Sequence, residues 1–205
     1  MYKFAIIGCG RISHKIAEGL AGNKDKAVLV ALSDIIADKM DSTEKTYNEK
    51  SGLNLSINKY TDYKEMIEKE DIDVAIISTE SGYHEEIGLY CLENNINVII
   101  EKPLAMSIEG AQRLVDKAKE KGLKLAASHQ NRFNYPIQLL KKAIQENRMG
   151  KIFNGMARIL WTRDMNYYLQ APWRGTWDLD GGTLMNQCIH NIDLFAVPYN
   201  LCVWL

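Results

Sequence analysis

Short apolar runs alternate with longer stretches of helical periodicity from the start of the chain to about residue 128. The runs 74–77 and 98–100 are apolar at every position, which is typical of parallel strands covered on both faces. The pattern predicts strands at residues 3–7, 27–33, 73–78, 97–100 and 124–127, and helices at about 12–21, 38–51, 83–94 and 108–121. This alternation indicates an α/β protein with a doubly wound parallel sheet.

The pattern changes after residue 128. The expected elements there are a helix at 135–147, a long strand at 151–161, a loop rich in Trp, Tyr, Arg and Asp at 162–180, and a helix at 181–197. We therefore expect a nucleotide-binding domain over 1–128 and the beginning of an α+β open-sheet domain over 129–205. Because one strand cannot form a sheet alone, the second domain is expected to be incomplete, through truncation or reliance on a partner chain.

Composition argues against several classes of protein. Lys and Arg total 25 against 26 Asp and Glu, so the net charge of -1 gives no electrostatic case for binding nucleic acid or an anionic membrane. No apolar stretch is long enough to span a bilayer. Cys9, Cys91, Cys188 and Cys202 lie far apart, which argues against a metal site or a disulfide framework. We expect reduced thiols in a cytoplasmic protein.

A glycine loop follows the first predicted strand. Gly8 and Gly10 lie on either side of Cys9, and Arg11 and Ile12 lead into the predicted helix. The first glycine permits a tight turn, and the second lets the backbone approach a pyrophosphate closely. Exposed N–H groups and the positive end of the helix then favour the anion. This strand, loop and helix predict a Rossmann domain that binds a dinucleotide.

Asp34 ends the second predicted strand. A carboxylate there can accept hydrogen bonds from both ribose hydroxyls and would repel a 2′-phosphate, so the sequence favours NAD over NADP. The alternative is that Asp34 only caps the helix that follows.

Lys102 comes directly after another predicted strand, between Glu101 and Pro103. The carboxyl ends of strands in an open α/β sheet face the ligand crevice, so a lysine there would project beside a bound nicotinamide. The alternative is a solvated surface lysine.

Five short motifs resemble those of the Gfo/Idh/MocA oxidoreductases, a family named for glucose-fructose oxidoreductase and inositol dehydrogenase. They are GCGRI at 8–12, STESGYH at 78–84, EKPL at 101–104, HQNRF at 129–133 and GGTLMNQCIHNID at 181–193. Each motif is unspecific by itself, but the five in this order are specific and cover essentially the whole chain.

The resemblance implies an NAD-dependent oxidoreductase with Lys102 and His190 as catalytic residues. It also implies a cis peptide bond before Pro103 and a homo-oligomer built by the second domain. The residues expected to bind the cofactor are Gly8, Gly10, Arg11, Ile12, Asp34, Thr79, His84, Glu101, Lys102 and Asn131.

Residues 161–177 resemble the branch of the family that acts on nucleotide-linked sugars, including UDP-N-acetylglucosaminuronate. A UDP-linked sugar is therefore the expected substrate, with Arg163, Tyr168, Arg174 and Asn186 as its contacts. The alternative for the arginines is pairing with Asp164, Asp178 or Asp180 in a structural loop. A third hypothesis is a polyol or inositol dehydrogenase. It is disfavoured because those enzymes of the family carry aspartate at the position of Asn186. A catalytically silent regulator that binds NAD or a sugar also stays open.

Oxidation of a sugar hydroxyl needs acceptors for a hydride and for a proton. His190 is the expected general base, because imidazole titrates near neutral pH. Lys102 is expected to hold the oxygen and to stabilise negative charge on it. Asp193, one helical turn after His190, is a candidate for orienting that ring or anchoring a local network.

Overall fold

The structure is a computed structural model that describes residues 1–196. The chain divides into two compact units, Met1–Ala127 and Ser128–Leu205.

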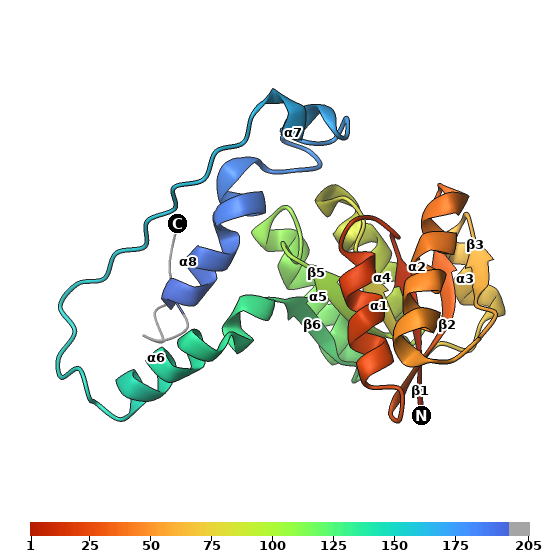
Figure 1. Cartoon of the computed structure of the whole chain (residues 1–205), viewed down its shortest axis with the longest axis horizontal. Helices are drawn as coiled ribbons and strands as arrows, with labels where there is room; N and C mark the ends of the chain where they lie inside the picture. The colour runs from red at the N-terminus through yellow and green to blue at the C-terminus, as the bar shows by residue number, and fades with distance from the viewer. Residues whose placement is uncertain (197–205) are drawn as a thin grey trace. The chain divides into compact units, whose positions relative to one another are not determined.

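A six-stranded sheet forms the centre of the first unit, in the order β3-β2-β1-β4-β5-β6 (Figure 1). Its strands are β1 (Tyr2–Ile7), β2 (Ala27–Ser33), β3 (Asn58–Tyr60), β4 (Val74–Ile77), β5 (Asn97–Glu101) and β6 (Leu125–Ser128). Strand β1 pairs in parallel with β2 on one side and with β4 on the other. The strand order reverses between β1 and β4, and doubly wound sheets bind their ligands at this switch point.

Helices cover both faces of the sheet, as Figure 1 shows for α1 and α2 on one face and α4 and α5 on the other. They are α1 (Ser13–Gly22), α2 (Ala37–Ser51), α3 (Tyr63–Lys69), α4 (His84–Glu93) and α5 (Ile108–Lys121). Successive strand residues point to opposite faces. Ile6 and Ile76 accordingly pack with α1 and α2, whereas Ile7 and Ile77 pack with α3, α4 and α5. This two-sided burial explains why β4 is apolar at every position and β5 is apolar at its three central positions.

The predicted strands and helices of the first unit are all present, with ends that differ by one or two residues. Strand β3 and helix α3 were not predicted. Strand β3 has three residues and includes the polar Asn58 and Lys59, so it carries no hydrophobic alternation. Helix α3 has seven residues, which is too short for a clear helical period.

The described part of the second unit contains helices and turns. They are a 3₁₀ turn (Gln130–Phe133), α6 (Tyr135–Gln145), α7 (Met165–Leu169), a π-helical turn (Leu184–Cys188) and α8 (Ile189–Ala196). The prediction of a strand at 151–161 is wrong, because this segment has no regular secondary structure. A strand needs a partner for its backbone N–H and C=O groups, and residues 129–196 include no other strand.

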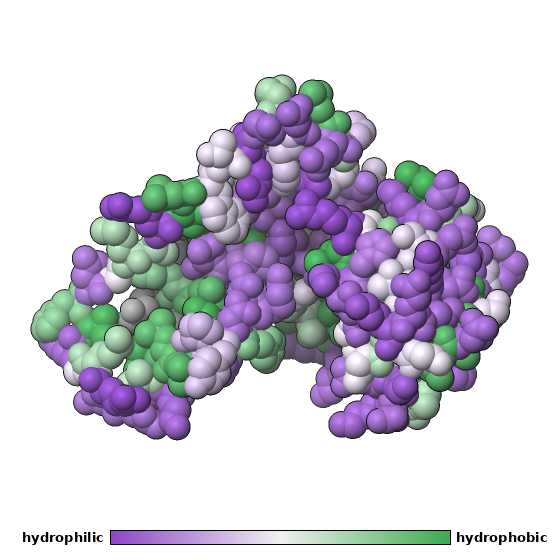
Figure 2. Space-filling view, viewed as in Figure 1, coloured by the Kyte–Doolittle hydropathy of each residue, from purple (hydrophilic) through white to green (hydrophobic). Residues whose placement is uncertain are grey.

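Apolar side chains on the strandless segment are open to solvent. Phe153, Met156 and Leu160 are 84%, 77% and 83% exposed. Figure 2 shows green, apolar patches over the second unit, and the first unit is mostly purple and white. None of the helices within residues 1–196 has the length and apolarity needed to span a lipid bilayer.

Candidate functional site

The glycine loop is tied to the ends of two strands. Gly8 has a φ of 90°, and its N–H donates to Ser33 O at 2.8 Å, while Ser78 Oγ donates to Gly8 O at 2.7 Å. A Cβ atom on Gly8 would lie 2.7 Å from both Ser78 C and Thr79 N. Glycine is therefore required here by conformation and by space.

The second glycine of the loop faces open space. A Cβ on Gly10 would meet no atom within 4 Å. Helix α1 begins three residues later at Ser13, whose hydroxyl donates to Gly10 O at 2.7 Å, and no side chain caps the helix N-terminus or places a carboxylate in its first turn. The backbone around Gly10 can thus receive an anionic group close to the positive end of a helix, as a dinucleotide pyrophosphate requires.

The Asp34 carboxylate is held by two backbone N–H groups after the end of β2. Its Oδ2 accepts from the N–H of Cys9 at 2.7 Å, and its Oδ1 accepts from the N–H of Ile36 at 2.8 Å. The carboxylate therefore braces the glycine loop and caps the turn before α2. Burial, reinforced by the Asp34 charge, raises the pKa of the Cys9 thiol to about 12, so this loop cysteine is protonated at neutral pH.

His84 is 1% exposed, which changes the role expected for it. Its Nδ1 lies 2.7 Å from Pro103 O and its Nε2 lies 3.2 Å from Thr79 O. Burial lowers the pKa of His84, so the ring is neutral at pH 7. His84 is therefore a positioning residue that joins the loop after β4 to the loop after β5, because its ring has no surface open to a cofactor.

Lys102 follows the last residue of β5, and its peptide bond to Pro103 is cis, as the family resemblance implies. Glu101 Oε2 accepts from the N–H of Lys102 at 3.4 Å. Because β5 pairs with β4 and β4 pairs with β1, Lys102 stands at the same edge of the sheet as the glycine loop. The remaining expected cofactor residues of this unit are Thr79, half-buried, and Arg11 and Ile12, both exposed.

In the second unit, His190 lies in the first turn of α8. The ring of His129 meets that of His190 edge to face, with centroids 6.0 Å apart. Asp193 accepts from Arg132 Nε at 2.7 Å and also from Nη2, and its Oδ2 lies 3.6 Å from His129 Nδ1. Asp193 thus anchors a network that links α8 to the turn carrying Asn131.

Two arginines share one aromatic ring in this unit. The Cζ atoms of Arg163 and Arg174 lie 5.1 Å and 4.3 Å from the centroid of the Tyr167 ring, and the Tyr168 ring meets Tyr167 edge on. Arg163 also donates to Gln187 Oε1 at 3.0 Å. Within residues 1–196 neither guanidinium forms an ion pair with a carboxylate.

The acidic residues considered as partners for the arginines have other roles. Asp164 accepts from the N–H of Tyr167 at 3.1 Å, and the buried Asp180 accepts from the N–H of Gly175 at 2.8 Å. Asn186 also donates to Asp180. Asn186 is therefore held by the loop that precedes it. The structural-loop alternative is not observed for Asp164 and Asp180.

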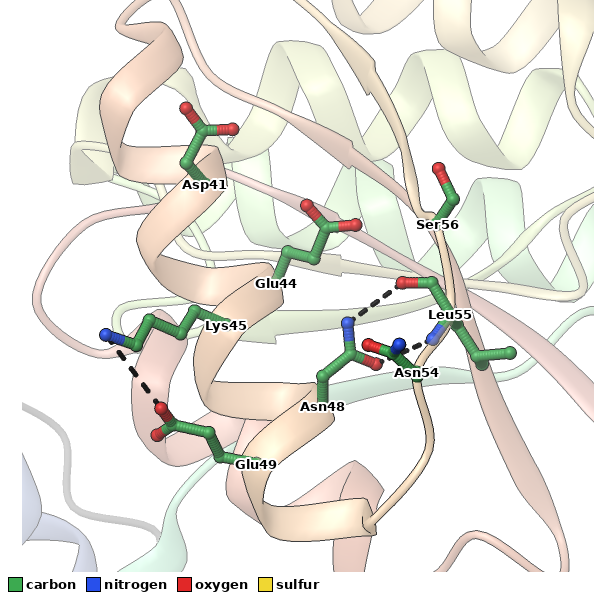
Figure 3. Close-up of a pocket in the computed structure, with 8 residues that line it drawn as sticks. All are labelled: Asp41, Glu44, Lys45, Asn48, Glu49, Asn54, Leu55 and Ser56. Carbon is green, nitrogen blue, oxygen red and sulfur yellow. Dashed lines mark hydrogen bonds and ion pairs between the residues drawn. The ribbon is translucent and has the colours of Figure 1, made fainter.

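A hollow of about 560 Å³ lies beside α2, away from the glycine loop (Figure 3). Its lining is polar, and Asn48 bridges both backbone groups of Leu55, through contacts of 2.8 and 3.0 Å. Lys45 lies 3.9 Å from Glu49. The polar groups of Asn48 and Lys45 therefore bond to neighbours within the hollow, and we assign no reactive centre to it. Residues 1–196 also contain no cluster of His, Cys, Asp and Glu arranged to hold a metal ion.

Comparison with protein families confirms the resemblance. Residues 2–129 match the model of the oxidoreductase family with an NAD-binding Rossmann fold. Residues 137–197 match the Gfo/Idh/MocA C-terminal domain. The chain belongs to the Gfo/Idh/MocA family. Its first unit is therefore an NAD-binding Rossmann domain.

The curated relatives of this Gfo/Idh/MocA chain include dehydrogenases and reductases. It is 28% identical over 149 residues to myo-inositol 2-dehydrogenase of Thermotoga maritima, covering 73% of this chain and 42% of the relative. It is 26% identical over 203 residues to 1,5-anhydro-D-fructose reductase of Ensifer adhaerens, covering 98% of this chain and 57% of the relative. The chain thus spans about half the length of the curated relatives it matches.

A solved structure is similar over nearly all of this Gfo/Idh/MocA chain. It is the WlbA dehydrogenase from Bordetella pertussis in complex with NADH and UDP-GlcNAcA, at 32% identity and a TM-score of 0.86. The match covers 95% of this chain and 56% of WlbA.

Some residues of the Gfo/Idh/MocA chain that now stand close to the expected sites carried no signal in the sequence. Lys39 belongs to no motif, and its relevance comes from Asp34, which it approaches in space. Tyr167 lies in the segment that resembles the nucleotide-sugar branch, but its contact with Arg163 is seen only in the structure. His129 and Arg132 lie inside a family motif, but their pairing with Asp193 spans some sixty residues of sequence.

Proposed function

We propose that the chain is an NAD-dependent oxidoreductase that transfers a hydride between the nicotinamide and a hydroxyl group of a sugar. We propose further that this sugar is linked to a nucleotide. The observation that carries this proposal is the arrangement at one edge of the sheet. A glycine loop with an open Gly10, the carboxylate of Asp34 and the residue Lys102 follow the carboxyl ends of β1, β2 and β5.

The chemistry follows from these residues. NAD supplies the ring that accepts the hydride when it is bound. As the C–H bond breaks, the hydroxyl proton passes to His190 and the C–O bond becomes a carbonyl. By the family resemblance, Lys102 would donate a hydrogen bond to the reacting oxygen and stabilise the negative charge that develops there. His84 acts indirectly by holding the backbone at Thr79 and Pro103, next to Lys102.

The nucleotide-linked sugar is supported by Arg163 and Arg174. Their guanidinium groups flank Tyr167, and within the described residues they have no carboxylate partner. Guanidinium matches a carboxylate or a phosphate bidentately, so the pair suits a uronate or a diphosphate. WlbA, which is similar over 95% of this chain, binds UDP-GlcNAcA. Tyr168 and Asn186, which donates to Asp180, are further proposed contacts of the substrate.

Inositol is the second candidate substrate, because curated relatives include myo-inositol 2-dehydrogenase. Asn186 in place of the aspartate disfavours it. We further propose that the protein is cytoplasmic and forms homo-oligomers. The exposed apolar side chains at 153, 156 and 160 support self-association.

The proposal is tested in two steps. Isothermal titration calorimetry of the chain with NAD should show binding, because the first unit holds most of the cofactor contacts. NADH formation is then followed with UDP-GlcNAcA, UDP-GlcNAc and myo-inositol. UDP-GlcNAcA should be oxidised fastest, at a rate below that of a full-length relative, and His190→Ala should abolish turnover without loss of NAD binding. Lys102→Ala should also abolish turnover.

Three results would contradict the proposal. Absence of NAD binding would contradict the proposed cofactor site. Faster oxidation of myo-inositol than of UDP-GlcNAcA would contradict the proposed nucleotide-sugar substrate. NAD binding without turnover of any sugar favours the silent regulator.

A further inference from the structure

Lys39 approaches the carboxylate of Asp34, the residue proposed to contact the cofactor ribose. It is the third residue of α2, and its Nζ lies 3.9 Å from Asp34 Oδ1. The Lys39 side chain is 45% exposed, whereas the Asp34 side chain is 8% exposed. The ammonium therefore stands at the solvent side of a carboxylate that is itself held in the protein.

The backbone at Lys39 is fixed by the neighbouring helix. Lys39 O accepts from Thr43 Oγ1 at 2.9 Å, and the Thr43 hydroxyl lies 2.9 Å from Ser13 Oγ. Ser13 is the first residue of α1 and is bonded to Gly10 O. The Thr43 and Ser13 hydroxyl groups thus lie between the first turn of α2, which carries Lys39, and the glycine loop.

The two charges act oppositely on a phosphate at the ribose. Each oxygen of the Asp34 carboxylate accepts one hydrogen bond from a backbone N–H, and a carboxylate at this position repels a 2′-phosphate. Lys39 attracts the same group. Among the ion pairs of the described residues, Asp34 has Lys39 as its cationic partner.

We propose that Lys39 sets how strongly the chain discriminates between NAD and NADP, by offsetting part of the repulsion from Asp34. The proposal rests on the NAD site of the proposed function. It means that the chain prefers NAD and still binds NADP measurably, and that the residual NADP affinity depends on Lys39. The Lys39 contribution is about fivefold in NADP affinity, the factor expected for one exposed charge pair in a water-like dielectric.

The test compares dissociation constants for NAD and NADP by calorimetry on the wild-type chain, Lys39→Ala and Lys45→Ala. Lys45 is the matched control, because it lies on the same helix and its partner is Glu49. In Lys39→Ala, NADP should bind about fivefold more weakly while NAD changes by less than about twofold. The difference should shrink at high salt, where exposed charges are screened. Lys45→Ala should change neither constant.

The outcomes separate this proposal from the proposed function. If the folded wild-type chain fails to bind NAD, the proposed function fails. If it binds NAD, three results overturn the role of Lys39: undetectable NADP binding by wild type, an unchanged NADP to NAD ratio in Lys39→Ala, or an equal effect of Lys45→Ala. Circular dichroism of each variant confirms that it has folded.

Discussion

Replacing Gly8 by alanine should unfold the cofactor loop, whereas the same substitution at Gly10 should leave the fold intact. Gly8 has a φ of 90°, and its Cβ would lie 2.7 Å from Ser78 C, 2.7 Å from Thr79 N and 2.8 Å from Ser78 O. All three are backbone atoms of the segment after β4, so no side-chain rotation relieves the overlap. The loop or the end of β4 must move.

The magnitude follows from three contributions. Placing a residue with a Cβ at positive φ costs about 1–2 kcal/mol. Separating the loop from β4 and β2 weakens the bonds from Ser78 Oγ to Gly8 O and from Gly8 N to Ser33 O, each worth about 1 kcal/mol. The expected destabilisation is about 3–4 kcal/mol, a large share of the 5–15 kcal/mol typical of a domain.

Gly10→Ala is the matched control. A Cβ there meets no atom within 4 Å, and Gly10 does not have a positive φ. Its stability should change by less than about 1 kcal/mol. The added methyl group instead enters the space proposed for the pyrophosphate, so NAD affinity should fall by about tenfold or more.

Urea unfolding followed by circular dichroism measures stability, and calorimetry measures NAD binding. The reasoning is refuted if Gly8→Ala unfolds at the wild-type urea concentration, or if Gly10→Ala binds NAD as tightly as the wild type does. A third refuting result is an equal loss of stability in both variants, since it would show that the backbone overlap at Gly8 has no special effect.

Two further predictions concern His84 and Asp193. Burial lowers the pKa of folded His84 below 6.5, the ordinary value for histidine, so the unfolded chain takes up a proton first. The resulting stability is present above pH 6.5 and is lost as the pH falls through the folded pKa. Urea unfolding between pH 7 and pH 5 should therefore show a steeper loss for wild type than for His84→Gln, and equal slopes would contradict the assignment. Asp193→Asn removes the charge that Arg132 and His129 share, and amides of α8 should exchange hydrogen about tenfold faster by mass spectrometry. Asp178→Asn, at an exposed site, should leave that exchange unchanged, and an unaltered rate in Asp193→Asn would show that the network does not hold the helix.

The sequence by itself determined the architecture of the first unit except for β3 and α3. Local features of the sequence each predict one strand, turn or helix. These features are the apolar runs, the helical periods between them, and the order Gly8, Gly10, Asp34. Asp34 shows the limit of such information, because its position predicted both a ribose contact and a helix cap. In the structure, the Asp34 carboxylate accepts from the N–H groups of Cys9 and Ile36, and no side chain caps the N-terminus of α2.

Only the tertiary structure decided which groups meet across the chain. It buried His84 between Thr79 and Pro103, brought Lys39 to Asp34 and joined Asp193 to Arg132. It also left residues 151–161 without the strand that their composition favours. The physical reason is the same in each case: hydrophobic periodicity specifies which face of an element is buried, but a hydrogen bond, an ion pair or a strand needs a partner that is distant in sequence, and packing alone supplies or withholds that partner.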